Sequence, residues 1–431
     1  MRRPLLSWAA LVASASLVAV PFRTDWKVKA PPLTGAVDWP FLPMVAVALV
    51  VGLGLAVRLP GWCARLSWRR MLVVVALVAL GWGSALALVR GPSGLDRGLD
   101  GPFEYPAVVD QVDRIGVDRF AETFTDPEVL RSYPVHVEGH PLGAALLFVG
   151  LDRIGLGGAA AAAAFLVLAG ATTAPAVLLA VREVAGERQA RRAAPFLVLG
   201  PLAIWMVSSA DALYAAVGAW AVALLVLATG ARTPVRRLGL AVAGGLVFGL
   251  GIHLSYGLAP LVLVPVAVVV VRRRWSVLAG AALGGAAVVG AAAAAGFWWL
   301  DGLAATHVRY LAGVAPSRPF AYFAPLGNPA AFAVTVGPVV AVALVRVRDR
   351  RLWLLAGAAL AAVVVADVTG LSKGEVERIW LPFAPWLLVL AAGLSASTDE
   401  PAAAWWTGAV SLLGLQVVVA VLAESVVKTL W

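Results

Sequence analysis

The stretch VHVEGHPLG, residues 135–143, places two histidines and a glutamate just before an apolar run. His136, Glu138 and His140 could contact a polar substrate, and imidazole and carboxylate groups could also hold a metal. Two histidines and one glutamate within five residues are weak spacing evidence for a metal site. His140 also precedes a proline, which is favoured at the first helical position. We therefore predict substrate binding and no cofactor, with a divalent metal as the open alternative.

A second stretch rich in acids, GLDRGLDGPFEY, lies upstream at residues 94–105. It offers three carboxylates, Asp96, Asp100 and Glu104, among glycines that favour tight turns. A carboxylate near a hydroxyl group can act as a general base. Asp100 lies between two glycines, where a turn could bring its carboxylate toward the membrane surface, so we rank it first, Asp96 second and Glu104 third.

The elements that must position these residues are membrane spans. Of 431 residues, 61% are hydrophobic and only 13% are charged, whereas a soluble domain carries roughly 25% charged residues. Many segments approach the roughly 20 apolar residues that cross a bilayer. The net charge of +10 comes from basic residues in short loops, which is the pattern of cytoplasmic loops and does not indicate nucleic-acid binding. We predict an all-α polytopic protein of the plasma membrane.

The arginine-rich loops predict the topology, with the N-terminus in the cytoplasm. The loops expected inside are 58–70, 182–192, 232–237, 272–274 and 346–351. Joining them predicts about thirteen spans, at 4–22, 41–58, 71–89, 157–181, 195–209, 211–229, 238–254, 257–271, 276–299, 328–345, 352–368, 379–395 and 403–421. The first span could instead be a cleaved signal peptide. The spans 195–209 and 257–271 are short for a full crossing.

Three regions follow from this map. Residues 1–89 form N-terminal spans, 90–156 an extracytoplasmic acidic loop with a re-entrant or interfacial helix, and 157–431 the main bundle. We expect the interfacial helix at 140–155, because one more crossing would put the loop 182–192 outside. In the loop, AVVDQVDRIGVDRF (107–120) has helical apolar spacing and predicts one amphipathic helix on the membrane surface.

Five polar stretches fall on the outer face and, together with His140 at the end of the first, hold all four histidines. They are 90–139, 208–214, 253–257, 300–327 and 367–378. Asp211 and His253 border apolar spans, where ionisable groups are costly and usually face a cavity or a partner. Asp211 could alternatively cap a helix, and His253 could belong to an ordinary outer turn. We include both among the substrate-binding candidates.

These features together resemble the GT-C superfamily of integral membrane glycosyltransferases. The likeness is to the dolichyl-phosphate-mannose:protein mannosyltransferase-like branch and its actinobacterial relatives, and the abundance of arginine, alanine and valine is typical of GC-rich genomes such as those of actinobacteria. The motifs that carry it are GLDRGLDGPFEY, HPLGAALLFVGLDRIG, VREVAGERQARRAAPFLVLGPLAIWMVSSADALYAAVGAW and LSKGEVERIWLPFAPWLLVLAAGL, which cover about 90–230 and 367–395. Leu142 stands where the branch has a second proline, and two spans precede the acidic loop where one is common.

The resemblance implies transfer of a sugar from a polyprenyl-phosphate donor to an acceptor on the outer face. The acceptor, whether glycan, lipid or protein, stays open. The leaving phosphate needs a cation, and arginine suits it because its planar fork binds two oxygens. Arg378 is our first candidate, Lys373 the second and Arg309 the third. Arg378 could alternatively be an interfacial anchor paired with Glu375.

Two other functions remain open from the sequence. In a lipid or glycan transporter or flippase, the acids and histidines would form a path for protons or substrate. Many transporters contain inverted repeats, and none is evident in this sequence. A polymerase or ligase of lipid-linked glycans would also have its site on the outer face.

Overall fold

The computed structural model describes residues 1–38, 42–207, 209–394 and 402–428, and helices make up most of these ranges. The strands found there are β1 (Ala36–Val37) and β2 (Val427–Lys428), which pair antiparallel and tie the first loop to the end of the last helix. The predicted all-α class is confirmed. Ser208, part of one predicted outer stretch, lies outside the described residues.

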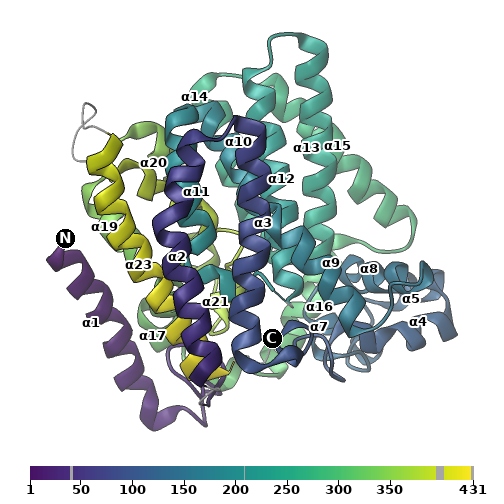
Figure 1. The fold of residues 1–431 in the computed structure, drawn as a ribbon. Helices are drawn as coiled ribbons and strands as arrows, with labels where there is room; N and C mark the ends of the chain where they lie inside the picture. Colours follow the sequence, from purple (N-terminus) through teal and green to yellow (C-terminus); the bar gives the residue numbers. More distant parts are fainter. Residues whose placement is uncertain (39–41, 208, 395–401, 429–431) are drawn as a thin grey trace.

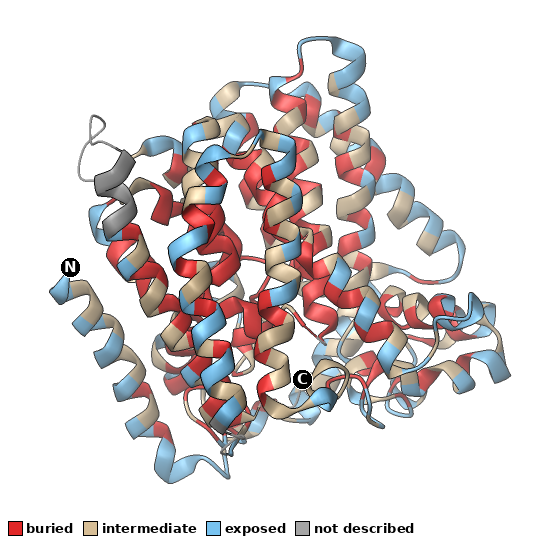
Figure 2. Ribbon diagram, viewed as in Figure 1, coloured by how far each residue is buried: buried red, intermediate tan, exposed pale blue. Residues whose placement is uncertain are grey.

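Nine stretches of helix within the described residues are long and apolar enough to cross a bilayer, so the chain is a multi-pass membrane protein. They correspond to α1 (Arg2–Ala19), α2 (Leu42–Arg65), α3 (Trp68–Ala87), α9 (Ala159–Ala171) continued by α10 (Thr173–Ala185), α12 (Ala210–Gly230), α13 (Pro234–Leu254), α15 (Ser276–Ala294), α20 (Arg350–Val368) and α23 (Ala402–Val426). Buried residues concentrate in the centre of the bundle, and α1 stands at its edge with mostly exposed or half-buried residues (Figure 2). Exposed leucines such as Leu17 and Leu77 suit a lipid surrounding.

The predicted count of thirteen spans is not confirmed. In the described residues, the predicted span 328–345 consists of α18 (Asn328–Val336) and α19 (Pro338–Arg346), bent by 96°. Gly337, with φ of +73°, makes the bend, because a positive φ is easy only for glycine. The other three are short: α11 (Glu187–Leu199), the segment Tyr256–Arg272 that ends in α14 (Leu263–Arg272), and the segment Ala384–Gly393 that begins with α22 (Ala384–Leu388).

Predicted cytoplasmic loops lie together at one end of the bundle. Arg191 donates to the carbonyl of Cys63 at 2.6 Å, which joins the loops 182–192 and 58–70. Arg272 forms an ion pair with Glu183 at 2.8 Å, which adds a third loop. The tight turn between α2 and α3 marks this end at the top of Figure 1.

The acidic loop folds into short helices at the opposite, lower end (Figure 1). They are α4 (Val109–Ile115), α5 (Val117–Thr123), α6 (Pro127–Leu130), α7 (Val135–Glu138) and α8 (Leu142–Arg153). The single helix predicted over 107–120 is wrong, because Gly116 adopts φ of +83° and separates α4 from α5. Two apolar side chains of this segment, Val112 and Phe120, are fully enclosed, whereas Ile115 is exposed.

The segment 140–155, where we expect an interfacial helix, contains α8, which begins just after Pro141. It packs against the end of α13, where a Cβ on Gly143 would collide with the carbonyl of His253. Glycine at this position therefore lets two backbones touch, and the acidic loop is held directly on the bundle.

Candidate functional site

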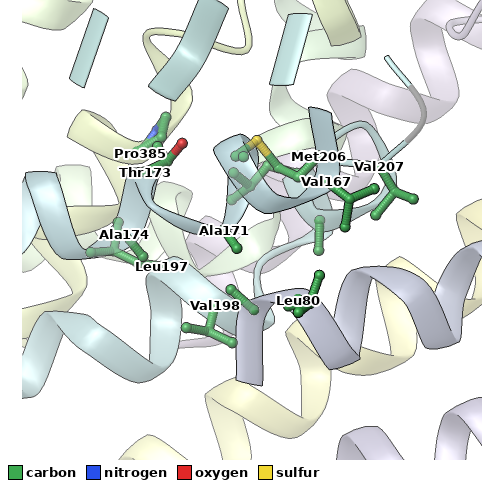
Figure 3. Close-up of a pocket in the computed structure, with 14 residues that line it drawn as sticks. Leu80, Val167, Ala171, Thr173, Ala174, Leu197, Val198, Met206, Val207 and Pro385 are labelled. Atoms are coloured by element: carbon green, nitrogen blue, oxygen red, sulfur yellow. The ribbon is translucent and has the colours of Figure 1, made fainter. Parts of the chain in front are cut away.

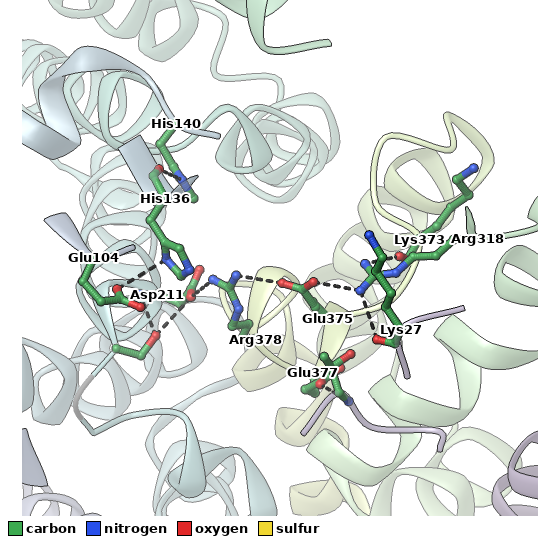
Figure 4. Close-up of polar contacts among 12 residues, drawn as sticks. Lys27, Glu104, His136, His140, Asp211, Arg318, Lys373, Glu375, Glu377 and Arg378 are labelled. Atoms are coloured by element: carbon green, nitrogen blue, oxygen red, sulfur yellow. Dashed lines mark hydrogen bonds and ion pairs between the residues drawn. The ribbon is translucent and has the colours of Figure 1, made fainter. Parts of the chain in front are cut away.

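Four of the five predicted outer stretches contribute described residues to one polar cluster, and the fifth, 253–257, lies beside α8. The segments that supply it, besides the acidic loop, are the start of α12, α16 (Trp299–Ala312), α17 (Phe320–Tyr322) with the residues before it, and α21 (Val376–Ile379). Figure 4 shows the polar side chains of this cluster extending from Glu104 across Arg378 to Lys373.

Glu104 and His136 face each other within the acidic loop. The backbone N–H of His136 donates to the carbonyl of Phe103 at 3.1 Å, so the segments carrying the two side chains are joined. The Glu104 carboxylate lies 3.5 Å from Nδ1 of His136. Burial raises the pKa of Glu104 to about 7, whereas burial and the nearby Arg378 lower the pKa of His136 to about 3. The two side chains therefore form a neutral or singly charged pair, because a protonated imidazole is disfavoured here.

Arg378 lies between two carboxylates. It donates to Asp211 at 2.9 Å and to Glu375 at 2.9 Å, and its side chain is 8% exposed. Asp211 does not cap α12, because Ser209 does so, accepting a hydrogen bond from the Asp211 N–H at 3.1 Å. The carboxylate of Asp211 accepts a hydrogen bond from the Ser209 hydroxyl and points toward Arg378 (Figure 4). Its place in the first turn of a helix also favours negative charge.

A small polar cavity lies between these groups. Glu104, His136, Asp211 and Arg378 line it, with Tyr105 beside them. Its volume of about 10 Å³ is the space of roughly one water molecule. A buried carboxyl group, an imidazole and a guanidinium thus meet at one cavity.

Aromatic side chains form the wall behind this cavity. The hydroxyl of Tyr214, on α12, donates to that of Tyr105 at 2.9 Å. The ring of His140 contacts both tyrosines, with centroid distances of 5.7 and 5.5 Å. Its Nδ1 lies 2.8 Å from the carbonyl of His136, so the two predicted histidines are linked through the backbone.

The remaining predicted cations have other partners. Arg309, on α16, forms an ion pair with the buried Glu138. Lys373 donates to the carbonyl of Ala315 at 2.7 Å. The three polar side chains of HVEGH therefore turn to different neighbours, and no group of three or more histidine, cysteine, aspartate or glutamate side chains in the described ranges is arranged to hold a metal.

Besides Lys373, Arg309, Glu138 and His140, three further predicted site residues do not line the cavity. Asp100 is exposed on the acidic loop and Asp96 is half-buried. His253 is buried at the end of α13, where its Nδ1 lies 2.8 Å from the carbonyl of Gly249 and its ring contacts Phe297 edge-on. Of the three carboxylates considered for the general base, only Glu104 lines the cavity.

Sequence reasoning did not single out Arg318, Ser209, Tyr105 or Tyr214. Arg318 is 4% exposed and donates to Glu375 at 3.0 Å. In the sequence it is one arginine in an outer loop, and nothing in the local pattern SRPF distinguishes it from a solvated charge. Its burial depends on segments more than fifty positions away.

A second cavity, of about 20 Å³, lies between α3, α10 and α11 (Figure 3). Its walls are apolar apart from Thr173, and Met206 and Val207 connect it in sequence to the start of α12. It contains no acid, base or cation. Of these two cavities, the polar one is therefore the one lined by acidic and basic side chains.

No family model matches the chain, and no curated protein matches it. Among solved structures, ArnT from Cupriavidus metallidurans in the apo state has a TM-score of 0.46 and 16% identity, covering 83% of this chain and 75% of that chain. ArnT from the same organism bound to undecaprenyl phosphate has a TM-score of 0.47 and 18% identity, covering 83% and 76%.

Proposed function

We propose that this chain is a membrane glycosyltransferase that moves a sugar from a polyprenyl-phosphate donor to an acceptor on the extracytoplasmic face. The observation that carries the proposal is the buried cluster of Glu104, His136, Asp211 and Arg378 around one cavity. It lies at the end of the bundle opposite the arginine-rich loops. A cluster at one end, instead of a path through the bundle, favours a transferase over a transporter.

Glu104 is the general base of the proposed reaction. The acceptor hydroxyl oxygen attacks the anomeric carbon of the donor sugar, and its proton passes to the Glu104 carboxylate. A base works best when its pKa is near the working pH, and burial raises the pKa of Glu104 to about 7. We prefer Glu104 to Asp100 and Asp96 because it lines the cavity.

Arg378 is the cation for the leaving group. The bond between the anomeric carbon and the phosphate oxygen breaks, and its electron pair stays on the polyprenyl phosphate. A guanidinium can hold two oxygens of that phosphate. Since Arg378 already contacts Asp211 and Glu375, these carboxylates compete with the donor phosphate for its guanidinium. A cavity of about one water also means that loop or side-chain movement must admit the sugar.

The general base is tested with matched amide variants of one loop. Glu104→Gln keeps the size of the side chain and removes its basicity, so transfer of labelled sugar from a polyprenyl-phosphate donor to envelope material should fall by about 10²-fold or more. Asp100→Asn is the control, because Asp100 is exposed outside the cavity, and its rate should match wild type. If Asp100→Asn loses transfer and Glu104→Gln keeps it, the base has been assigned to the wrong carboxylate.

The phosphate role is tested by binding of undecaprenyl phosphate to the purified chain in detergent. Arg378→Ala should bind it more weakly, and Arg378→Lys should restore little, because an ammonium lacks the planar fork. Thermal unfolding of each variant shows whether it is folded, since breaking a buried ion pair costs about 3–5 kcal/mol. A folded Arg378→Ala variant that binds as wild type would leave Arg378 only a structural anchor.

A further inference from the structure

Arg318 precedes α17 and is buried on the far side of Glu375 from Arg378 (Figure 4). Its guanidinium donates to the carbonyl of Lys373 at 2.7 Å and to that of Trp26 at 3.3 Å. It also donates to Glu375 at 3.0 Å. Arg318 thus connects the loop after α1, through Trp26, and the loop before α21, through Lys373, to a carboxylate of the proposed site.

The two arginines divide the carboxylate of Glu375 between them. Oε1 accepts from Arg318 and Oε2 accepts from Arg378, each at about the same distance of 3.0 and 2.9 Å. Although burial alone would raise the pKa of Glu375, the charges of Arg378 and Arg318 lower it to about 2. The carboxylate is therefore ionised and shared.

The backbone at this point is held in an unusual conformation. Glu375 has φ of +62°, which is uncommon for a residue other than glycine. Gly374 before it has φ of +81°, and a Cβ there would lie 3.2 Å from the Arg318 guanidinium carbon and from the Phe323 ring. Strain of this kind persists where the surroundings fix it, and it often marks functional sites.

We propose that Arg318 is a positioning residue for donor binding that acts on Arg378 through Glu375. By taking one oxygen of the shared carboxylate, it weakens the hold of Glu375 on Arg378 and keeps that guanidinium available to the donor phosphate. The inference rests on the proposed function.

The charge balance supports this role. Asp211, Glu375, Arg378 and Arg318 together carry no net charge. Without Arg318, two buried carboxylates would face one arginine, and the excess negative charge would oppose a phosphate. Such an interaction is strong here because the groups are shielded from water.

The experiment measures the dissociation constant of undecaprenyl phosphate for the purified full-length chain in detergent. Arg318→Met should weaken binding by about tenfold, the order expected from removing one neighbouring charge. Arg318→Lys keeps the positive charge but lacks the planar guanidinium that donates to the backbone carbonyls. Its dissociation constant should stay within about threefold of the wild-type value. The double variant Arg318→Met/Glu375→Gln should regain most of the lost affinity, because the competing carboxylate is gone.

Tyr322→Phe is the matched control. It removes one hydrogen bond, from the Tyr322 hydroxyl to the carbonyl of Ala15, in the same corner of the molecule without altering a charge, and its binding should equal that of wild type. Thermal unfolding is recorded for every variant.

The outcomes distinguish an effect of the positive charge of Arg318 from an effect of its hydrogen bonds to backbone carbonyls. If Arg318→Lys binds as weakly as Arg318→Met, or the double variant binds more weakly than either, Arg318 is a clamp for backbone carbonyls and the inference is wrong. If Arg318→Met does not fold, the comparison of Arg318→Lys with wild type decides alone. Absence of binding by wild type overturns the proposed function, and this inference with it.

Discussion

At the scale of single residues, burial separates the proton affinities of two neighbouring groups. Glu104 and His136 lie 3.5 Å apart, yet their pKa values move in opposite directions, to about 7 and about 3. Near neutral pH, the imidazole of His136 is neutral, and the carboxyl group of Glu104 is present in both its protonated and its ionised form. A group in this state can accept a proton from a hydroxyl and release it to water.

This state predicts the pH dependence of the proposed transfer. Because the base must be ionised, the rate should rise between pH 5 and 8 with a midpoint near 7, the pKa of Glu104. In His136→Asn the rising limb should stay near 7, since His136 is neutral throughout this range. The measurement is the initial rate of sugar transfer against pH. A midpoint near 4.5, or loss of the limb in His136→Asn, contradicts the assignment.

At the scale of elements, close helix packing in this bundle depends on glycine. Helices α13 and α15 cross where Gly245 and Gly284 let the two backbones approach. Small residues are favoured at such crossings in membranes, because lipid gives no hydrophobic drive for helix association. Helix α13 ends next to His253, and α15 is followed by α16. The packing of α13 on α15 therefore helps to position segments that lie near the site.

We expect Gly245→Ala to destabilise the chain. Its Cβ would meet the backbone carbonyl of Ala281, which cannot move aside easily, and overpacking of this kind costs about 1–3 kcal/mol. Gly239→Ala, in the same helix but with open space around the added Cβ, should leave stability unchanged or raise it slightly. The thermal unfolding midpoints in detergent compare the two. Equal losses for both variants would show that backbone contact at Gly245 is unimportant.

At the scale of the whole molecule, the two ends of the bundle differ in charge. The arginine-rich loops meet at one end, and the proposed site lies at the other. If basic loops stay in the cytoplasm, as they commonly do, the site opens outside the cell.

Cysteine labelling tests this orientation. In a chain whose Cys63 is replaced, because that residue is buried and would not react on either side, Ser93→Cys and Ala304→Cys should react with a membrane-impermeant maleimide in intact cells. Val235→Cys, 83% exposed at the basic end, should react only after permeabilisation. Labelling of Val235→Cys from outside would reverse the predicted sidedness.

The class of the protein, the order of its apolar segments and the grouping of basic and polar loops can be read from the amino-acid sequence. These properties depend on local composition: an apolar run long enough to cross a bilayer does so wherever its neighbours lie. The same local reasoning predicted a helix in the segment 140–155. It missed the break at Gly116, because it followed apolar spacing and did not weigh the backbone freedom of glycine.

Which polar residues meet depends on the packing of the folded chain. Arg378 reaches Asp211 across 167 positions of sequence, and Arg318 reaches Glu375 across 57. Asp100, ranked first from its glycine neighbours, is exposed, whereas Glu104 is drawn into the cavity by the contact between His136 and Phe103. Which side chains come into contact depends on how the helices pack and how the loops fold against them. The stabilising interactions form between residues that are distant in the sequence. No short stretch of the sequence contains both members of such a pair.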